Sequence, residues 1–150
     1  MRKQWIILLA LLLAPFAYAA DESAQAQNVK VLQIVKVLKD QFDRPVTPLE
    51  VPVVVVSGDF AVADWLQDNR GGRALLRRDA DGWHTLMCSG AQFKSPQALR
   101  HAGVQEDDAT RISRELGQQE QNLTAEQLKK IDSFEGIVNV LTNPEHHEHH

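Results

Sequence analysis

The sequence predicts an α+β fold in which an N-terminal helix packs on a four-stranded antiparallel meander and two to three helices follow. Three observations predict this class. Apolar residues recur with helical period near residues 28–39, and four short β-rich runs separated by turn residues lie between residues 51 and 88. Helix start and stop signals then follow from residue 95 onward.

The first twenty residues have the features of a secretory signal peptide. Arg2 and Lys3 supply a positive start, residues 5–14 form an unbroken apolar run, and residues 17–19 fit the small-x-small pattern of a cleavage site. The apolar run is too short for a permanent anchor, which needs about 20 apolar residues. We therefore expect cleavage after residue 19 or 20, export to a bacterial periplasm, and no stable membrane insertion of the mature protein.

Three segments follow from these patterns: a signal peptide over residues 1–20, one α+β domain over 21–141, and a flexible His-rich tail over 142–150. The chain carries 16 basic and 20 acidic residues, and removal of the leader changes the net charge from −4 to −6. An acidic chain without a basic block is not expected to bind nucleic acid. The single Cys excludes an internal disulfide.

The first helix is expected to extend from about residue 28 to Lys39, after a polar segment, residues 21–27, that we expect to fray. One apolar face is predicted for this helix, because its members recur at steps of three and four: Val31, Val35, Leu38 and Phe42. Val29, Leu32 and Ile34 widen the stripe, which predicts a deeply packed helix.

Four strands are predicted next, at Val51–Ser57, Phe60–Gln67, Arg73–Arg78 and Trp83–Cys88, joined by short turns that favour an antiparallel meander. Gly71 and Gly72 are assigned to a turn. On the third strand, Arg73 and Arg77 share a face that we expect to be wet or to line a groove, and Asp64 is expected to pair with an arginine of that strand. Such a sheet has one face to cover, and helices must cover it.

The C-terminal part carries local helix signals. Ser95 followed by a proline predicts a helix start, Gly103 predicts the end of that helix, and Thr124 with Gln127 forms a capping box. The order of helix, meander and helices is similar to the cystatin-like and nuclear-transport-factor-like folds. Similarity at the level of the fold does not define a function.

The tail is the first candidate for chemistry, because residues 145–150 contain two carboxylates and four imidazoles, those of His146, His147, His149 and His150. Imidazole binds Cu(II), Ni(II) and Zn(II). The alternative is an expression tag, although Glu148 interrupts the histidine run. Copper is the metal that we expect the tail to bind, and we do not expect folding to require it.

Cys88 is the second candidate, since a thiolate is a soft ligand that suits Cu(I). The competing interpretation is a core residue, which the frequent burial of free cysteines favours. Met87 is expected to point to the opposite face of its strand. His84 is expected to share a face with Cys88 at about 13 Å, too far to share one ion. No catalytic motif is present in the sequence, and we expect a protein that is not an enzyme.

A longer pattern resembles a known family. It contains Gly58-Asp59-x-Ala61-x-Ala63-x-Trp65-x-Gln67, Gly71-Gly72-Arg73-Ala74-Leu75-Leu76-Arg77, Trp83, Leu86-x-Cys88-x-Gly90, Ala102-Gly103-Val104 and Phe134-Glu135-Gly136. This pattern, over roughly residues 51–138, resembles the copper uptake system-associated proteins, which are small exported bacterial proteins. The resemblance implies a role in periplasmic copper handling, with a copper carrier and an inner-membrane copper transporter as partners.

Three functional hypotheses follow. The first is a periplasmic accessory protein of copper uptake or homeostasis that binds copper through its tail, with Cys88 as a second site. The second is a module that binds a small ligand or a peptide between helix and sheet. A cavity lined by Trp65 or Trp83 would favour this second hypothesis, and a sheet face filled completely by Val31, Val35 and Leu38 would count against it. The third is an adaptor of a membrane transporter that acts without metal.

Overall fold

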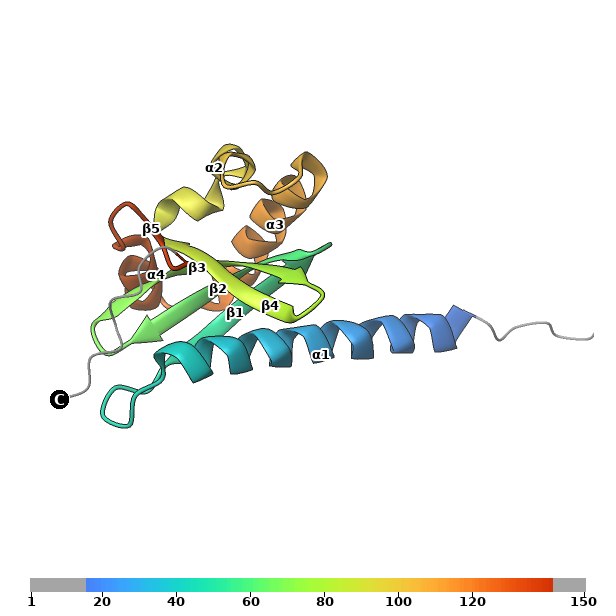
Figure 1. The fold of residues 1–150 in the computed structure, drawn as a ribbon, viewed down its shortest axis with the longest axis horizontal. Helices are drawn as coiled ribbons and strands as arrows, with labels where there is room; N and C mark the ends of the chain where they lie inside the picture. Colours follow the sequence, from blue (N-terminus) through green and yellow to red (C-terminus); the bar gives the residue numbers. More distant parts are fainter. Residues whose placement is uncertain (1–15, 142–150) are drawn as a thin grey trace, which may run out of the picture.

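The structure, a computed structural model, describes residues 16–141 and has three layers (Figure 1). A long helix, α1 (Phe16–Phe42), lies on one side of a sheet of five strands. Three helices lie on the other side: α2 (Pro96–His101), α3 (Glu106–Gln119) and α4 (Ala125–Asp132). Two short 3₁₀ turns, η1 (Ala91–Lys94) and η2 (Glu120–Asn122), connect these elements. The predicted α+β class, with an N-terminal helix and further helices after the sheet, is confirmed.

The sheet is antiparallel throughout, and its strands lie in the order of the sequence: β1 (Glu50–Ser57), β2 (Phe60–Gln67), β3 (Arg70–Asp79), β4 (Gly82–Ser89) and β5 (Ile137–Asn139). The prediction of four strands was incomplete. β5 returns from the C-terminal part of the chain and pairs with the last residues of β4, Met87 to Ser89. From the sequence, the apolar run at residues 137–141 is compatible with a short strand, but a strand of three residues is too short for its pattern to establish it.

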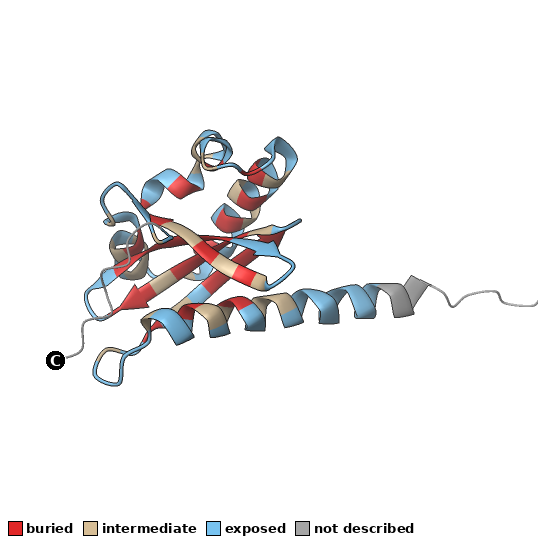
Figure 2. Ribbon diagram, in the orientation of Figure 1, coloured by how far each residue is buried: buried red, intermediate tan, exposed pale blue. Residues whose placement is uncertain are grey.

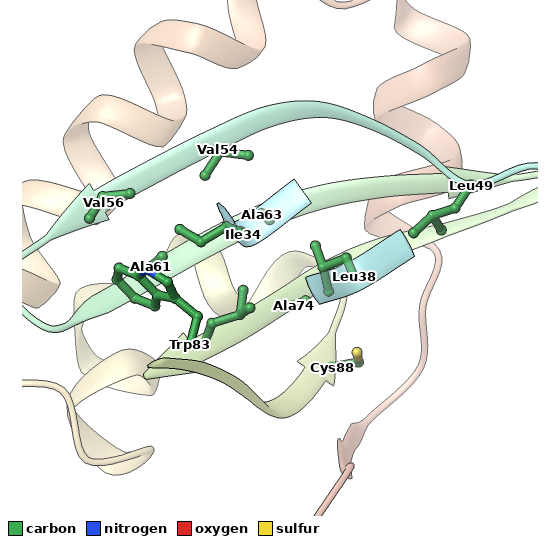
Figure 3. Close-up of a cluster of buried hydrophobic side chains, with 11 residues drawn as sticks. Ile34, Leu38, Leu49, Val54, Val56, Ala61, Ala63, Ala74, Trp83 and Cys88 are labelled. Carbon is green, nitrogen blue, oxygen red and sulfur yellow. The ribbon is translucent and has the colours of Figure 1, made fainter. Parts of the chain in front are cut away.

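Both faces of the sheet are buried, whereas the sequence predicts only one buried face (Figure 2). The first face packs against α1, and its cluster is drawn in Figure 3: Ile34, Leu38, Leu49, Val54, Val56, Ala61, Ala63, Ala74, Leu76, Trp83 and Cys88. The second face packs under α2 and α3, and its cluster is Val53, Val55, Val62, Leu75, Phe93, Leu99, Val104, Ala109, Ile112 and Leu116. The unbroken valine run of β1 fits this arrangement, since alternate residues of a strand point to opposite faces.

α1 begins earlier in the chain than predicted, and fewer of its apolar residues are buried than predicted. Residues 21–27 are helical rather than frayed, because alanine, glutamine and glutamate are good helix formers. Figures 1 and 2 show this half of the helix extending beyond the sheet with an exposed surface. Val29 and Leu32 are therefore 53 % and 68 % exposed, and only the stripe through Ile34 and Leu38 is buried. The expectation that Val29 and Leu32 pack deeply is wrong.

The helix signals of the C-terminal part act as predicted. The Ser95 side chain accepts from the amide of Ala98 at the start of α2. Thr124 and Gln127 form both hydrogen bonds of the capping box, at 2.9 and 3.1 Å. Gly103 has a positive φ of 99°, which favours glycine after a helix end. These local signals fix where the covering helices begin and end.

Candidate functional site

A cleft with a volume of about 440 Å³ opens at the C-terminal end of α1. Its walls come from α1, from the first face of the sheet and from the segment after α4. Its apolar lining consists of Leu38, Phe42, Leu49, Trp65, Ala74, Phe134, Val138 and Val140, and its polar lining consists of Arg44, Thr47, Gln67, Arg70 and Cys88. An apolar concavity with a few polar groups is the usual form of a small-molecule site.

Trp65 forms one wall of the cleft because its strand neighbour is a glycine. Trp65 lies opposite Gly72 in the β2–β3 register, and a Cβ atom at Gly72 would come within 2.8 Å of the indole ring. Gly71 is equally constrained, since its Cβ would lie 2.9 Å from the amide nitrogen of Ile131 in α4. Both glycines are in strand β3 and not in the predicted turn. They are required for close approach of neighbouring groups.

Phe134 closes the cleft from the C-terminal side. Its ring meets the ring of Trp65 edge to face, with centroids 5.9 Å apart and planes at 81°. Such an aromatic pair stabilises by about 0.5–1.5 kcal/mol beyond its buried area. The chain then continues into β5, so that Val138 and Val140 complete this wall. Three segments far apart in the sequence therefore build the cleft.

The rim of the cleft is held by the loop after α1. The Gln67 amide donates to the carbonyl oxygens of Phe42 and Thr47, each at 2.8 Å, and the Asp43 carboxylate accepts from the Leu49 amide at 2.6 Å. These bonds tie the loop to the sheet. Arg44 projects from this loop.

Two arginines, Arg44 and Arg70, stand at the rim of the cleft. Within residues 16–141, no Asp or Glu oxygen lies within 4 Å of either guanidinium group. Arg44 donates only to backbone oxygens, those of Asp43 at 2.8 Å and Gln41 at 3.4 Å. Both side chains are exposed. The cleft therefore combines an apolar interior with a positively charged rim.

Cys88 belongs both to the core under α1 and to the wall of the cleft, and its side chain is 8 % exposed. Figure 3 shows its sulfur at the end of the cluster beyond Ala74. Burial raises the pKa of the Cys88 thiol to about 11, and the nearby Trp65 side chain opposes part of this rise. At neutral pH, Cys88 is thus a protonated thiol, which is a poor metal ligand and a poor nucleophile.

Neither Met87 nor His84 lies on the face of the sheet that carries Cys88. Met87 packs in the cluster of the second face, as expected from strand alternation. His84 lies opposite Arg77 in the β3–β4 register, so it is on the other face of the sheet from Cys88. The prediction that His84 and Cys88 share a face is therefore wrong. The cause is a bulge in β4: the register passes from Leu75–Met87 to Leu76–Thr85, and the extra residue reverses the alternation.

The predicted copper ligands of the tail, His146, His147, His149 and His150, lie outside the described residues. Within residues 16–141, no three side chains of His, Cys, Asp or Glu are grouped so that they could hold a metal ion. His84 instead lies 3.0 Å from Asp79 in an exposed pair. Across the same described range, no helix is long and apolar enough to cross a membrane.

A second group of polar side chains is buried on the opposite face of the sheet, around Arg73. This arginine is fully buried, and its guanidinium lies 2.6 Å from Glu120, 2.8 Å from Asp132 and 3.5 Å from Asp64. The predicted pairing of Asp64 with an arginine of the third strand is confirmed. The expectation of a wet face is wrong at Arg73, because η2 and α4 cover it. We call these residues, with Lys94, the Arg73 cluster.

The Arg73 cluster is balanced in charge when Asp64 carries a proton. Burial raises the pKa of Asp64 to about 8, the charge of Glu120 adds to the rise, and Arg73 opposes it. Two positive groups, Arg73 and Lys94, then face two negative groups, Glu120 and Asp132. A raised carboxyl pKa often marks an active site, but Asp64 and Arg73 are closed off from solvent. The cluster fastens the C-terminal helices to the sheet.

Comparison with known proteins adds no further assignment. No family model, no curated protein and no solved structure matches the chain. The resemblance to the copper uptake system-associated proteins thus stays a prediction. The cleft is the feature of the described residues with the chemistry of a binding site.

Proposed function

We propose that the folded part of this protein is a binding module and that the cleft at the end of α1 takes a small apolar ligand. The observation that carries the proposal is the lining of the cleft: an aromatic pair, Trp65 and Phe134, faces aliphatic side chains in a volume of about 440 Å³. That volume lies in the range of about 300–1,000 Å³ that small-molecule sites occupy. The lining contains no pair of acid and base groups, which favours binding over catalysis.

The position of the cleft fits the cystatin-like or nuclear-transport-factor-like arrangement, which we retain as part of this proposal. In such a fold a helix lies across a curved sheet and a pocket forms between the two layers. Here Leu38 and Phe42 of α1 form one side of the cleft, and Ala74 and Cys88 of the sheet form its floor. The helix covers the sheet without filling this end.

The test is titration with N-phenyl-1-naphthylamine, an uncharged dye that fluoresces in apolar surroundings. We expect saturable binding to the wild-type protein and at least tenfold weaker binding to a Val138→Trp variant, whose larger side chain occupies the cleft. Ile137→Trp is the matched control, because Ile137 is the neighbouring exposed residue of β5 and does not line the cleft. Equal binding by both variants would place the dye elsewhere and contradict the proposal.

A second candidate function is supported by the sequence of the tail. We propose that the protein is a periplasmic accessory protein of copper uptake or homeostasis and that His146, His147, His149 and His150 bind copper. Four imidazoles and two carboxylates within six residues favour this function, as does the family resemblance. A periplasmic copper carrier and an inner-membrane copper transporter are the proposed partners. An adaptor role without metal is the alternative.

The copper proposal is tested by titrating Cu(II) and Cu(I) into the full chain, a chain ending at residue 144 and a Cys88→Ser variant. We expect binding to follow the tail and to be unchanged in Cys88→Ser, since the buried thiol is protonated. If the shortened chain binds copper as well as the full chain, the tail is not the site. Capture of the transporter from membranes in metal-free buffer, with an intact or a shortened tail, would instead support the adaptor role.

A further inference from the structure

The charges around the cleft differ from those of the chain as a whole. The chain has 20 acidic and 16 basic residues, yet the lining of the cleft contains two arginines and no acid. Neither Arg44 nor Arg70 has a carboxylate within 4 Å among residues 16–141. By contrast, Arg73 and Arg78, which lie on the same strand as Arg70, both have carboxylate partners, at 2.6 and 2.8 Å. The positive charge at the rim is thus left available to a ligand.

The Gln67 and Cys88 side chains are not available as strong donors. The Gln67 amide nitrogen donates to two backbone oxygens, those of Phe42 and Thr47. Cys88 is a protonated thiol within the apolar wall. Arg44 uses only one guanidinium nitrogen, Nη1, for its two backbone bonds, so the remaining N–H groups of Arg44 and those of Arg70 are the strongest donors at the cleft. A guanidinium group matches a carboxylate in shape as well as charge, since it presents two parallel N–H donors to the two oxygens.

We propose that the ligand of the cleft is a small amphipathic carboxylate, whose apolar body lies against Trp65, Phe134 and Val138 and whose carboxylate meets Arg44 and Arg70. This inference rests on the proposed binding function and names the chemical class of the ligand. Arg44 and Arg70 confer the preference for an anion, and the aromatic pair supplies the apolar contact. Both arginines are exposed, so the carboxylate end remains near solvent while the apolar end is buried.

The test compares octanoate with 1-octanol, which share one alkyl chain and differ in charge. Each is used to displace N-phenyl-1-naphthylamine from the wild-type protein at low salt. We expect octanoate to bind about tenfold more tightly than octanol, and the difference to shrink at high salt as exposed charges are screened. An Arg44→Gln/Arg70→Gln variant is expected to bind the two compounds equally. The matched control is Arg77→Gln/Arg111→Gln, which removes two exposed arginines that do not line the cleft.

The outcomes separate this inference from the proposed function. If octanoate and octanol bind the wild-type protein equally well, the preference for an anion is refuted and the apolar cleft stands. The preference of the cleft for an anion is also refuted if Arg77→Gln/Arg111→Gln loses the preference for octanoate as fully as Arg44→Gln/Arg70→Gln does. The net charge of the protein would then explain the preference. If the dye does not bind to the wild-type protein, so that there is nothing to displace, the proposed function fails.

Discussion

The Arg73 cluster gives the prediction with the largest expected effect on stability. Replacing Arg73 by Met keeps an unbranched apolar stem but removes the guanidinium group and its four hydrogen bonds. Two of these go to Glu120, at 2.6 and 2.9 Å, one to Asp132 at 2.8 Å, and one to the backbone oxygen of Gly90 at 3.0 Å. The Glu120 carboxylate, which is 3 % exposed, then retains only Lys94, at 3.2 Å, as a charged partner.

Removing one member of a buried ion pair costs about 3–5 kcal/mol, because the other charge remains buried without compensation. A typical domain has a free energy of unfolding of about 5–15 kcal/mol, so Arg73→Met should lose a large part of it. Arg78→Met is the matched control from the same strand. Arg78 forms an exposed pair with Asp59 at 2.8 Å, and its guanidinium lies 5.8 Å from the ring centroid of the buried Trp83. Its loss should cost about 1 kcal/mol.

The measurement is the free energy of unfolding from urea denaturation, with fluorescence and circular dichroism followed together to test for two-state behaviour. A double variant, Arg73→Met/Glu120→Gln, should recover part of the loss, because it also removes the uncompensated charge. If Arg73→Met is no more destabilising than Arg78→Met, Arg73 does not hold the C-terminal helices to the sheet, and our reasoning is refuted.

Three further predictions concern single residues. The pKa of Asp64 is raised from 3.8 to about 8 in the folded protein. Between these two pH values the folded protein therefore holds a proton on Asp64 that the unfolded chain has released. The free energy of unfolding of wild type relative to Asp64→Asn should therefore fall between pH 4 and 8, by up to about 1.4 kcal/mol per pH unit, and a difference that is flat or rising contradicts the assignment. Gly72→Ala should destabilise by about 1–3 kcal/mol in urea denaturation, since its Cβ would meet Trp65 at 2.8 Å, whereas Gly117→Ala, which meets nothing within 4 Å on α3, should stabilise by about 0.5–1 kcal/mol. The rate at which Cys88 reacts with a thiol reagent should rise with pH up to about 11, and a plateau near pH 9 would show an ordinary pKa.

The elements that sequence patterns predicted well depend on local interactions. The capping box of Thr124 and Gln127 is one such element, since all its partners lie within one turn of helix. The limits of β2 were predicted at both ends, because alternating residues and turn formers bracket it. Asp64 was paired with the third strand because an isolated acid in an apolar strand needs a partner nearby.

The features that the sequence did not reveal depend on contacts between distant segments. Arg73 was expected near solvent because nothing local indicates that Glu120, 47 residues later, covers it. The bulge that separates His84 from the face of Cys88 adds one residue to β4, and strict alternation cannot show that. The cleft itself joins α1, the sheet and the chain around Val138, so its lining is visible only in three dimensions. Trp65 was named as a candidate lining residue, but its neighbours were not.

Protection of Cys88 by a bound ligand is the most direct test of the cleft as the binding site. Cys88 is the only cysteine of the chain and lines the cleft, so its rate of modification by N-ethylmaleimide reports on that position alone. We predict that octanoate slows the modification in proportion to the occupancy measured by dye displacement, and that the Val138→Trp variant loses this coupling. Saturable octanoate binding that leaves the rate of Cys88 modification unchanged would contradict the account, because it would place the ligand outside the cleft.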